Sequence, residues 1–169
     1  MFSSLAENYF FSQVIHIRKK FLNTELQFLT LFFEKTSIFP VSVILIDKVV
    51  FFFIKSADYF TAKTYLKKLR YVIKNRKILV IRAETTLIKL IFSFFDDTYI
   101  HNVRTNEKPK RTIVDVLFLS NKDRAVAVGK EGKYIKSVNY LFKNFISINN
   151  LINKTGTIPL ELRCSLTTM

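Results

Sequence analysis

Two of the three glycines of this chain lie in one tetrapeptide, Gly129-Lys130-Glu131-Gly132, which separates two stretches with helical apolar spacing. Glycine adopts positive φ angles and lets another backbone approach closely, which a Cβ atom would block. The second helical stretch begins directly after the tetrapeptide. Because the first N–H groups and the positive dipole end of a helix attract a phosphate, this GKEG loop predicts a phosphate-binding site.

Basic and apolar side chains surround the GKEG loop. Cations near the sugar–phosphate backbone and apolar surface against the bases are what recognition of single-stranded RNA needs. The alternative is an ordinary helical corner that uses glycine for its bend, since GxxG occurs often by chance. Glu131 adds a negative charge, which either points away from the phosphate or weakens binding. The residues expected to bind RNA are Gly129, Lys130, Glu131 and Gly132, the flanking cations Lys122, Arg124, Lys133 and Lys136, and the apolar Val126, Val128 and Ile135.

No other residues combine into a catalytic or metal-binding set. Asp96 and Asp97 follow an apolar helical stretch, where adjacent carboxylates usually serve a turn. The single cysteine, Cys164, is far in sequence from His16 and His101, so the three do not have the spacing of metal ligands. We therefore expect no enzyme activity, no metal, no cofactor and no small-molecule substrate.

The charge of the chain favours a polyanionic partner. Lys and Arg number 27 against 13 Asp and Glu, which gives a net charge of +14. Nucleic acid is the first candidate, and the surface of an anionic membrane is the weaker one. No apolar run reaches the roughly 20 residues that a bilayer span needs. The longest candidate, residues 38–54, is interrupted by Asp47-Lys48, which predicts a turn between two strands, so we expect no membrane insertion.

Composition also bears on the cellular location. Phe, Ile, Lys, Asn and Tyr are frequent, Gly and Pro number 3 each, and Trp is absent. This bias follows the A+T content of codons and indicates an AT-rich genome. We expect an organelle, with the plastid stroma favoured over the mitochondrion, or otherwise the cytoplasm of an AT-rich prokaryote. The first 22 residues do not have the pattern of a secretory signal.

The chain contains an internal repeat. Residues 65–75 recur as residues 134–144, with apolar side chains at matching places, and upstream residues 32–36 match residues 94–98. The two offsets, 69 and 62, differ by seven residues. We place the insertion partly in the polar stretch 105–111, because a loop lengthens at small cost.

Each copy has the same order of patterns: helix, two β-branched strands, two helices and a last strand. This order predicts an α+β fold with a three-stranded mixed sheet and helices on one of its faces. The Phe51-Phe52-Phe53 run is expected in a strand core. The first copy is predicted to have a helix at 25–33 and strands at 39–46, 49–54 and 78–81, and the second a helix at 86–95 and strands at 99–104, 112–119 and 145–149.

Residues 121–136, with the GKEG loop at their centre, resemble the core of a type II KH domain. The tandem arrangement, over residues 24 to about 152, is similar to the short NusA proteins of archaea. The resemblance implies two KH modules that bind single-stranded RNA, a loop that clamps about four nucleotides, a role in transcription elongation or termination, and RNA polymerase as a partner. It divides the chain into an extension (1–23), a first module (24–82), a second module with the loop (83–153) and a tail (154–169).

The first copy departs from this family pattern. Phe60-Thr61-Ala62-Lys63 takes the place of GxxG and has no glycine, so we expect this module to keep its fold and to grip RNA poorly. KH domains of the same type also occur in a small-subunit ribosomal protein. A structural, rRNA-binding protein of the ribosome is therefore the alternative to a transcription factor.

Overall fold

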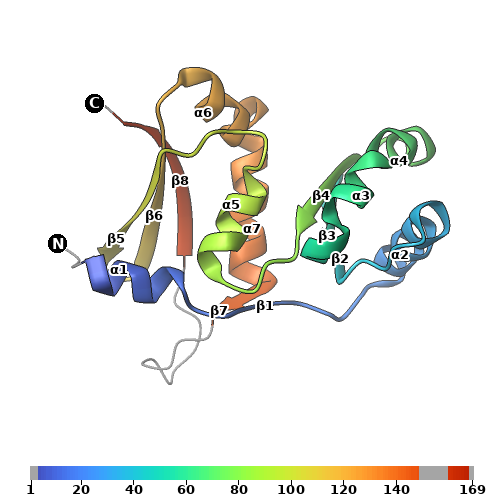
Figure 1. Ribbon diagram of the computed structural model, residues 1–169, viewed down its shortest axis with the longest axis horizontal. Helices are drawn as coiled ribbons and strands as arrows, with labels where there is room; N and C mark the ends of the chain where they lie inside the picture. The colour runs from blue at the N-terminus through green and yellow to red at the C-terminus, as the bar shows by residue number, and fades with distance from the viewer. Residues whose placement is uncertain (1–3, 149–159, 168–169) are drawn as a thin grey trace. The chain divides into compact units, whose positions relative to one another are not determined.

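The computed structural model describes residues 4–148 and 160–167, and the chain forms two compact units (Figure 1). The first unit comprises residues 17–84, and the second unit comprises residues 1–16 and 85–169. The predicted boundary between the two modules, at residues 82 and 83, lies within two residues of this division.

The first unit contains helices and a three-stranded mixed sheet in the order β2-β3-β4. Strands β2 and β3 are antiparallel, whereas β3 and β4 are parallel. Asp47 has a φ angle of 52° in the turn between β2 and β3, and aspartate is one of the residues that tolerate this conformation. The elements are α2 (Asn23–Thr36), β2 (Ser42–Ile46), β3 (Val49–Ile54), η1 (Ser56–Asp58), α3 (Tyr59–Thr64), α4 (Leu66–Val72) and β4 (Lys77–Arg82).

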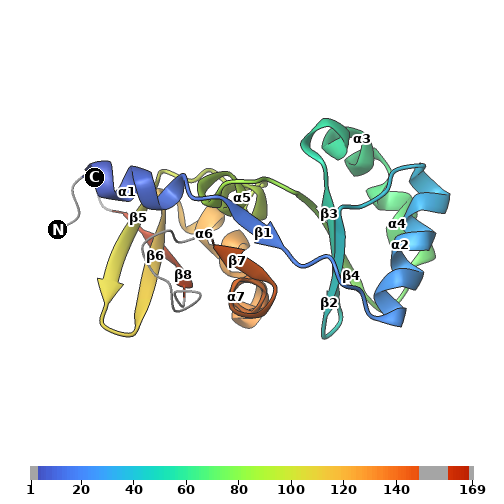
Figure 2. The same cartoon turned by 90° about the horizontal axis from the view of Figure 1, so that it is seen from below.

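Helices α2, α3 and α4 lie on one face of this sheet (Figure 2). The core between them contains Phe32 of α2, Phe52 of β3, Leu69 of α4 and Ile78 of β4. All three residues of the Phe51-Phe52-Phe53 run are fully buried, which confirms the prediction of a strand core. Large apolar side chains on a strand are worth about 1.5–3 kcal/mol each when buried, so β3 anchors the unit.

The second unit has a sheet of the same kind, in the order β5-β6-β8, antiparallel and then parallel. Buried side chains of α5 and α7 pack together, with the rings of Phe94 and Phe142 5.7 Å apart in a T-shaped contact. The elements are α1 (Ser4–Phe11), β1 (Ile15–Ile17), α5 (Leu87–Phe94), β5 (Asn102–Lys108), β6 (Arg111–Phe118), α6 (Asn121–Val128), η2 (Lys130–Gly132), α7 (Lys133–Asn144), β7 (Ile146–Ile148) and β8 (Leu160–Leu166).

The last strand of the second sheet is not the predicted one. Residues 146–148 form the short strand β7, which pairs with β1 rather than with β6. The third strand is β8, in the segment predicted as a tail from residue 154 onward. The N-terminal segment predicted as an extension to residue 23 contributes α1 and β1 to the second unit, and α2 begins at Asn23.

The prediction that the polar stretch 105–111 contains a lengthened loop is wrong. Residues 105–108 continue β5 and Arg111 begins β6, so the two strands form a hairpin with Pro109 and Lys110 at its turn. Proline cannot donate to a strand ladder but suits a turn. The two strands of the hairpin therefore pair through polar residues, which have no apolar pattern from which a strand could be predicted.

Each unit has the order helix, strand, strand, helix, helix, strand around its three-stranded mixed sheet, to which the second unit adds α1, β1 and β7. This arrangement confirms the predicted α+β fold of two modules with three-stranded mixed sheets. Among the described helices, none has the length and apolar character to cross a bilayer.

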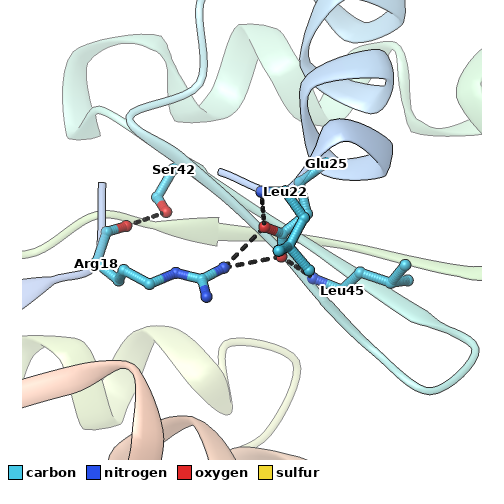
Figure 3. A network of polar contacts seen from close by, with 5 residues as sticks. All are labelled: Arg18, Leu22, Glu25, Ser42 and Leu45. Carbon is cyan, nitrogen blue, oxygen red and sulfur yellow. Dashed lines mark hydrogen bonds and ion pairs between the residues drawn. The ribbon is translucent and has the colours of Figure 1, made fainter. Parts of the chain in front are cut away.

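A buried carboxylate fastens the start of α2 to the sheet of the first unit (Figure 3). Glu25, with 1% of its surface exposed, accepts two hydrogen bonds from Nη2 of Arg18, at 2.8 and 2.9 Å. It also accepts the N–H of Leu22 at 2.8 Å and the N–H of Leu45 at 2.9 Å. The Ser42 hydroxyl donates to the Arg18 carbonyl at 2.6 Å. The Glu25 side chain thus caps α2 and forms hydrogen bonds both to β2 and to the segment that precedes the helix.

Candidate nucleic-acid interface

Helix α6 leads into the GKEG loop and has a defined beginning and end. Ser120 caps its start, because the Ser120 hydroxyl accepts the N–H of Asp123 at 3.1 Å. At the other end, the N–H of Gly129 donates to the Ala125 carbonyl at 2.9 Å. The helix therefore stops at the first residue of the loop, as the sequence predicts.

The backbone of the GKEG loop reverses at three positions of positive φ. Gly129 has φ 80° and ψ 170°, Glu131 has φ 56° and ψ 25°, and Gly132 has φ 71° and ψ 13°. The N–H of Gly132 donates to the Gly129 carbonyl at 3.1 Å, and α7 begins at the next residue. Within residues 4–148 and 160–167, the N–H groups of Lys130 and Glu131 have no hydrogen-bond acceptor. The loop can therefore offer both groups to an anion at the start of α7.

The two glycines are needed for different reasons. A Cβ atom on Gly129 would lie 2.6 Å from Cβ of Tyr134 and 2.9 Å from its backbone nitrogen, and the φ and ψ angles of Gly129 belong to a region that is essentially limited to glycine. A Cβ atom on Gly132 would meet nothing closer than Cε of Lys136, at 3.8 Å. Position 129 therefore requires glycine because of its close packing against Tyr134 as well as its backbone angles. Position 132 favours glycine only because its backbone is left-handed.

Substitutions at Gly132 test this difference. We expect Gly132→Ala to lower the free energy of unfolding by about 1 kcal/mol, because an L-residue in the left-handed region is strained. Gly132→Asn should lose clearly less, since asparagine tolerates this region. Urea unfolding followed by circular dichroism measures both values. Equal losses in the two variants would contradict the assignment of a conformational role to Gly132.

The five cations predicted to bind RNA are all exposed, and three of them surround the loop. Lys130 belongs to it, Lys133 opens α7, and Lys136 lies one turn later with its Cε beside Gly132. Glu131 faces Lys133, with 3.7 Å between Oε2 and Nζ and side chains 69% and 76% exposed. So exposed a pair adds little stability. The negative charge that the sequence places in the loop thus has a cation beside it.

Arg124 differs from the other cations because it also joins α6 to β8. Its Nε donates to the Cys164 carbonyl at 3.2 Å. Burial raises the pKa of the Cys164 thiol to about 12, and the nearby Arg124 charge lowers it only in part. This thiol is therefore protonated at neutral pH and is a poor nucleophile or metal ligand. Among the described residues, no cluster of His, Cys, Asp and Glu has the arrangement of a metal site.

The apolar residues of the predicted site are accessible to different degrees. Val126 on α6 is 52% exposed, whereas Val128 on α6 and Ile135 on α7 are half-buried. Lys122 precedes Val126 by one helical turn and lies on the same side of α6. A charged and an apolar side chain thus share one side of this helix. The arrangement of the three apolar residues as a single floor for bases stays a prediction.

Two residues of α7 outside the predicted set, Tyr134 and Asn139, connect this helix to neighbouring elements of the second unit. Asn139 pairs with the backbone of Leu162, because its Nδ2 donates to the Leu162 carbonyl at 3.0 Å and its Oδ1 accepts the Leu162 N–H at 2.7 Å. The Tyr134 hydroxyl donates to the Phe94 carbonyl, and its ring packs edge-on against Phe95. The alternation of apolar and polar residues in Leu160–Leu166 was a signal for β8.

The corresponding place in the first unit has no such loop. Residues 60–63 lie inside α3, and Tyr65, with φ −92° and ψ −1°, joins α3 to α4 without a reversal. The N–H of Tyr65 donates to the Ala62 carbonyl at 3.0 Å, and the N–H of Leu69 donates to the Tyr65 carbonyl at 2.9 Å. Within the described residues of α3 and α4, no φ angle is positive. The geometry of a GxxG clamp is therefore absent from these two helices.

Comparison with known proteins gives a likeness of fold. No family model and no curated protein matches the chain. Among solved structures, the chain is similar to the crystal structure of APE1850, an uncharacterised archaeal protein, with a TM-score of 0.60 and 18% sequence identity over 85% of this chain and 100% of that one. At this identity the likeness concerns the fold alone.

Proposed function

We propose that this chain is a non-enzymatic factor that binds single-stranded RNA through the GKEG loop. The observation that carries the proposal is the loop itself. Its positive-φ backbone offers the N–H groups of Lys130 and Glu131 at the start of α7, and three exposed lysines surround it. A phosphate at this place would receive hydrogen bonds, the helix dipole and local positive charge together.

The rest of the surface near the loop suits a single strand better than a duplex. Val126 is exposed enough to contact an unstacked base, and apolar surface of this kind has no use against paired bases. The net charge of +14 adds the general attraction to phosphates that speeds association. A loop of four residues can hold only a short stretch of the strand.

A short RNA gives the direct test. We expect a single strand of about six nucleotides to bind with a slope of log affinity against log salt of about −1.5 to −3, because two to four phosphate contacts contribute about −0.7 each. Fluorescence anisotropy between low and high salt measures this slope. An RNA duplex of equal length is the control and should bind more weakly. A slope steeper than about −6, or equal binding of the duplex, would contradict a one-loop site.

The resemblance to short archaeal NusA proteins supports a role in transcription elongation or termination on nascent RNA. Purification of the tagged chain from its own cells in high salt, followed by identification of the bound proteins, tests this role. We expect subunits of RNA polymerase. Recovery of a ribosomal small subunit instead would assign the chain to rRNA, and crosslinking with sequencing of the bound RNA would identify the transcript.

A further inference from the structure

The unit without a GxxG loop carries most of the net positive charge, +9 of the total of +14. Residues 17–84 contain 14 Lys and Arg side chains against 5 Asp and Glu, whereas the rest of the chain contains 13 against 8. Within residues 59–83, which include α3, α4 and β4, there are eight Lys and Arg and no Asp or Glu. A unit that served only as a packing partner would have no need of this concentration of charge.

Of the five exposed cations within residues 59–83, three lie on α4 and a fourth, Lys74, directly follows its C-cap residue. Lys67, Arg70 and Tyr71 are three and four positions apart and therefore share a side of the helix, and Lys68 and Lys74 are exposed beside them. In the described parts of the chain, Lys67, Lys68 and Arg70 have no ion-pair partner. We call the surface formed by Lys67, Lys68, Arg70, Tyr71 and Lys74 the α4 face.

Tyr71 gives the α4 face a second property besides charge. Its side chain is 78% exposed, and Nζ of Lys74 lies 5.6 Å from the centre of its ring. Burial of Leu69 fixes α4 on the core, so the opposite side of the helix presents Tyr71 to solvent. Exposed aromatic rings among cations are the surface on which unpaired bases stack, whatever their sequence. The bases of a duplex are already stacked and cannot use such a ring.

We propose that the α4 face is a second binding surface for single-stranded RNA, which holds the strand by charge and by stacking on Tyr71 rather than by a loop clamp. This inference rests on the proposed function of the GKEG loop, and it adds a second contact for the same ligand. A strand long enough to reach both surfaces is bound twice, so its affinity rises through effective concentration without any change at the loop. A short strand occupies one surface only.

The test uses the full chain with two single-stranded probes, oligo(U) of about six and about 25 nucleotides. One variant combines Lys67→Gln, Lys68→Gln and Arg70→Gln, and a second is Tyr71→Ala. The matched control combines Lys19→Gln, Lys20→Gln and Lys48→Gln, which removes the same charge from exposed positions elsewhere in the same unit. Glutamine keeps the helix propensity of lysine and arginine, so melting temperatures should agree closely.

For the long probe, the α4 triple variant should lose at least tenfold in affinity, and its salt slope should become shallower by about 2, since three contacts of about −0.7 are removed. Tyr71→Ala should lose at least fivefold with an unchanged slope. The control should lose less than threefold, and all variants should bind the short probe as the wild type does. Equal losses in the control and the triple variant, or unchanged affinity of Tyr71→Ala, would overturn the proposal. Failure of the wild type to bind the short probe would instead overturn the loop site.

Discussion

Replacing Lys130 and Glu131 together by aspartate is expected to lower the affinity for a short single-stranded RNA by at least tenfold, about 1.4 kcal/mol or more. The N–H groups of Lys130 and Glu131 that we propose as anion donors remain in the variant, but two carboxylates now stand beside them without the Lys130 cation. The attraction at the start of α7 is thereby reversed in sign for a phosphate. Anisotropy titration at low salt measures the loss.

The fold should survive this double substitution. Both side chains are exposed, and aspartate is one of the few residues that tolerate a φ angle such as the 56° of Glu131. Acidic residues at a helix start also interact favourably with its dipole. We therefore expect the circular dichroism spectrum and the melting temperature to stay close to those of the wild type.

Lys110→Asp is the matched control for the double variant, because it changes the net charge by the same amount in the exposed hairpin turn of the same unit. We expect it to leave binding of the short RNA within about twofold, since contacts far from the strand act only through screened charge. Normal binding by the double variant would show that the GKEG loop is only a turn between two helices and does not bind RNA. Two other basic runs of the sequence, Arg18-Lys19-Lys20 and Lys108-Pro109-Lys110-Arg111, would then be the next candidates for phosphate contact, although Arg18 is already paired with Glu25.

Some parts of the site and of the fold are predictable from sequence because their causes are local. Helix α6 ends at Val128 because the next residue, Gly129, has φ and ψ angles that suit only glycine and cannot continue a helix. Strand β3 coincides with its predicted range because an apolar, β-branched and aromatic run lies between a turn at Asp47 and the exposed Lys55. Neither feature depends on a distant segment.

The choice of the third strand in the second unit is not local. Residues 146–148 and 160–166 both have strand-like sequences, and the chain closes the sheet with the longer one. Strand β8 forms seven register pairs with β6, more than the three-residue strand β7 could form. Single-sequence periodicity shows which segments can be strands, but it does not show which partner each of them finds.

Arg18 shows the same limit for side chains. In sequence it belongs to a basic run with Lys19 and Lys20, and such a run suggests phosphate contact. In the fold its guanidinium lies against both oxygens of the buried Glu25. Seven positions separate the two residues, and Glu25 in turn reaches Leu45 of β2. Nothing in the spacing of the sequence predicts that one carboxylate serves three segments.

We expect Glu25→Ala to lower the free energy of unfolding by about 3 kcal/mol, more than Gly132→Ala or Glu34→Ala. Removal of one partner of a buried ion pair is costly because the other charge is left without compensation. Arg18 is partly exposed, at 27% of its side chain, which moderates this part of the loss. The N–H groups of Leu22 and Leu45 also lose their acceptor. Urea unfolding measures the change.

Two further variants separate the causes of this loss. Glu34→Ala removes an exposed carboxylate from the same helix and should cost less than about 0.5 kcal/mol. Glu25→Gln keeps one carbonyl acceptor of nearly the same shape but not the charge, so it should fall between the two alanine variants. If Glu25→Ala lowered the free energy of unfolding no more than Glu34→Ala does, water would be replacing the carboxylate. The contact between α2 and β2 would then depend on the apolar core alone. If Glu25→Gln were as stable as the wild type, the hydrogen bonds to the backbone would outweigh the ion pair with Arg18.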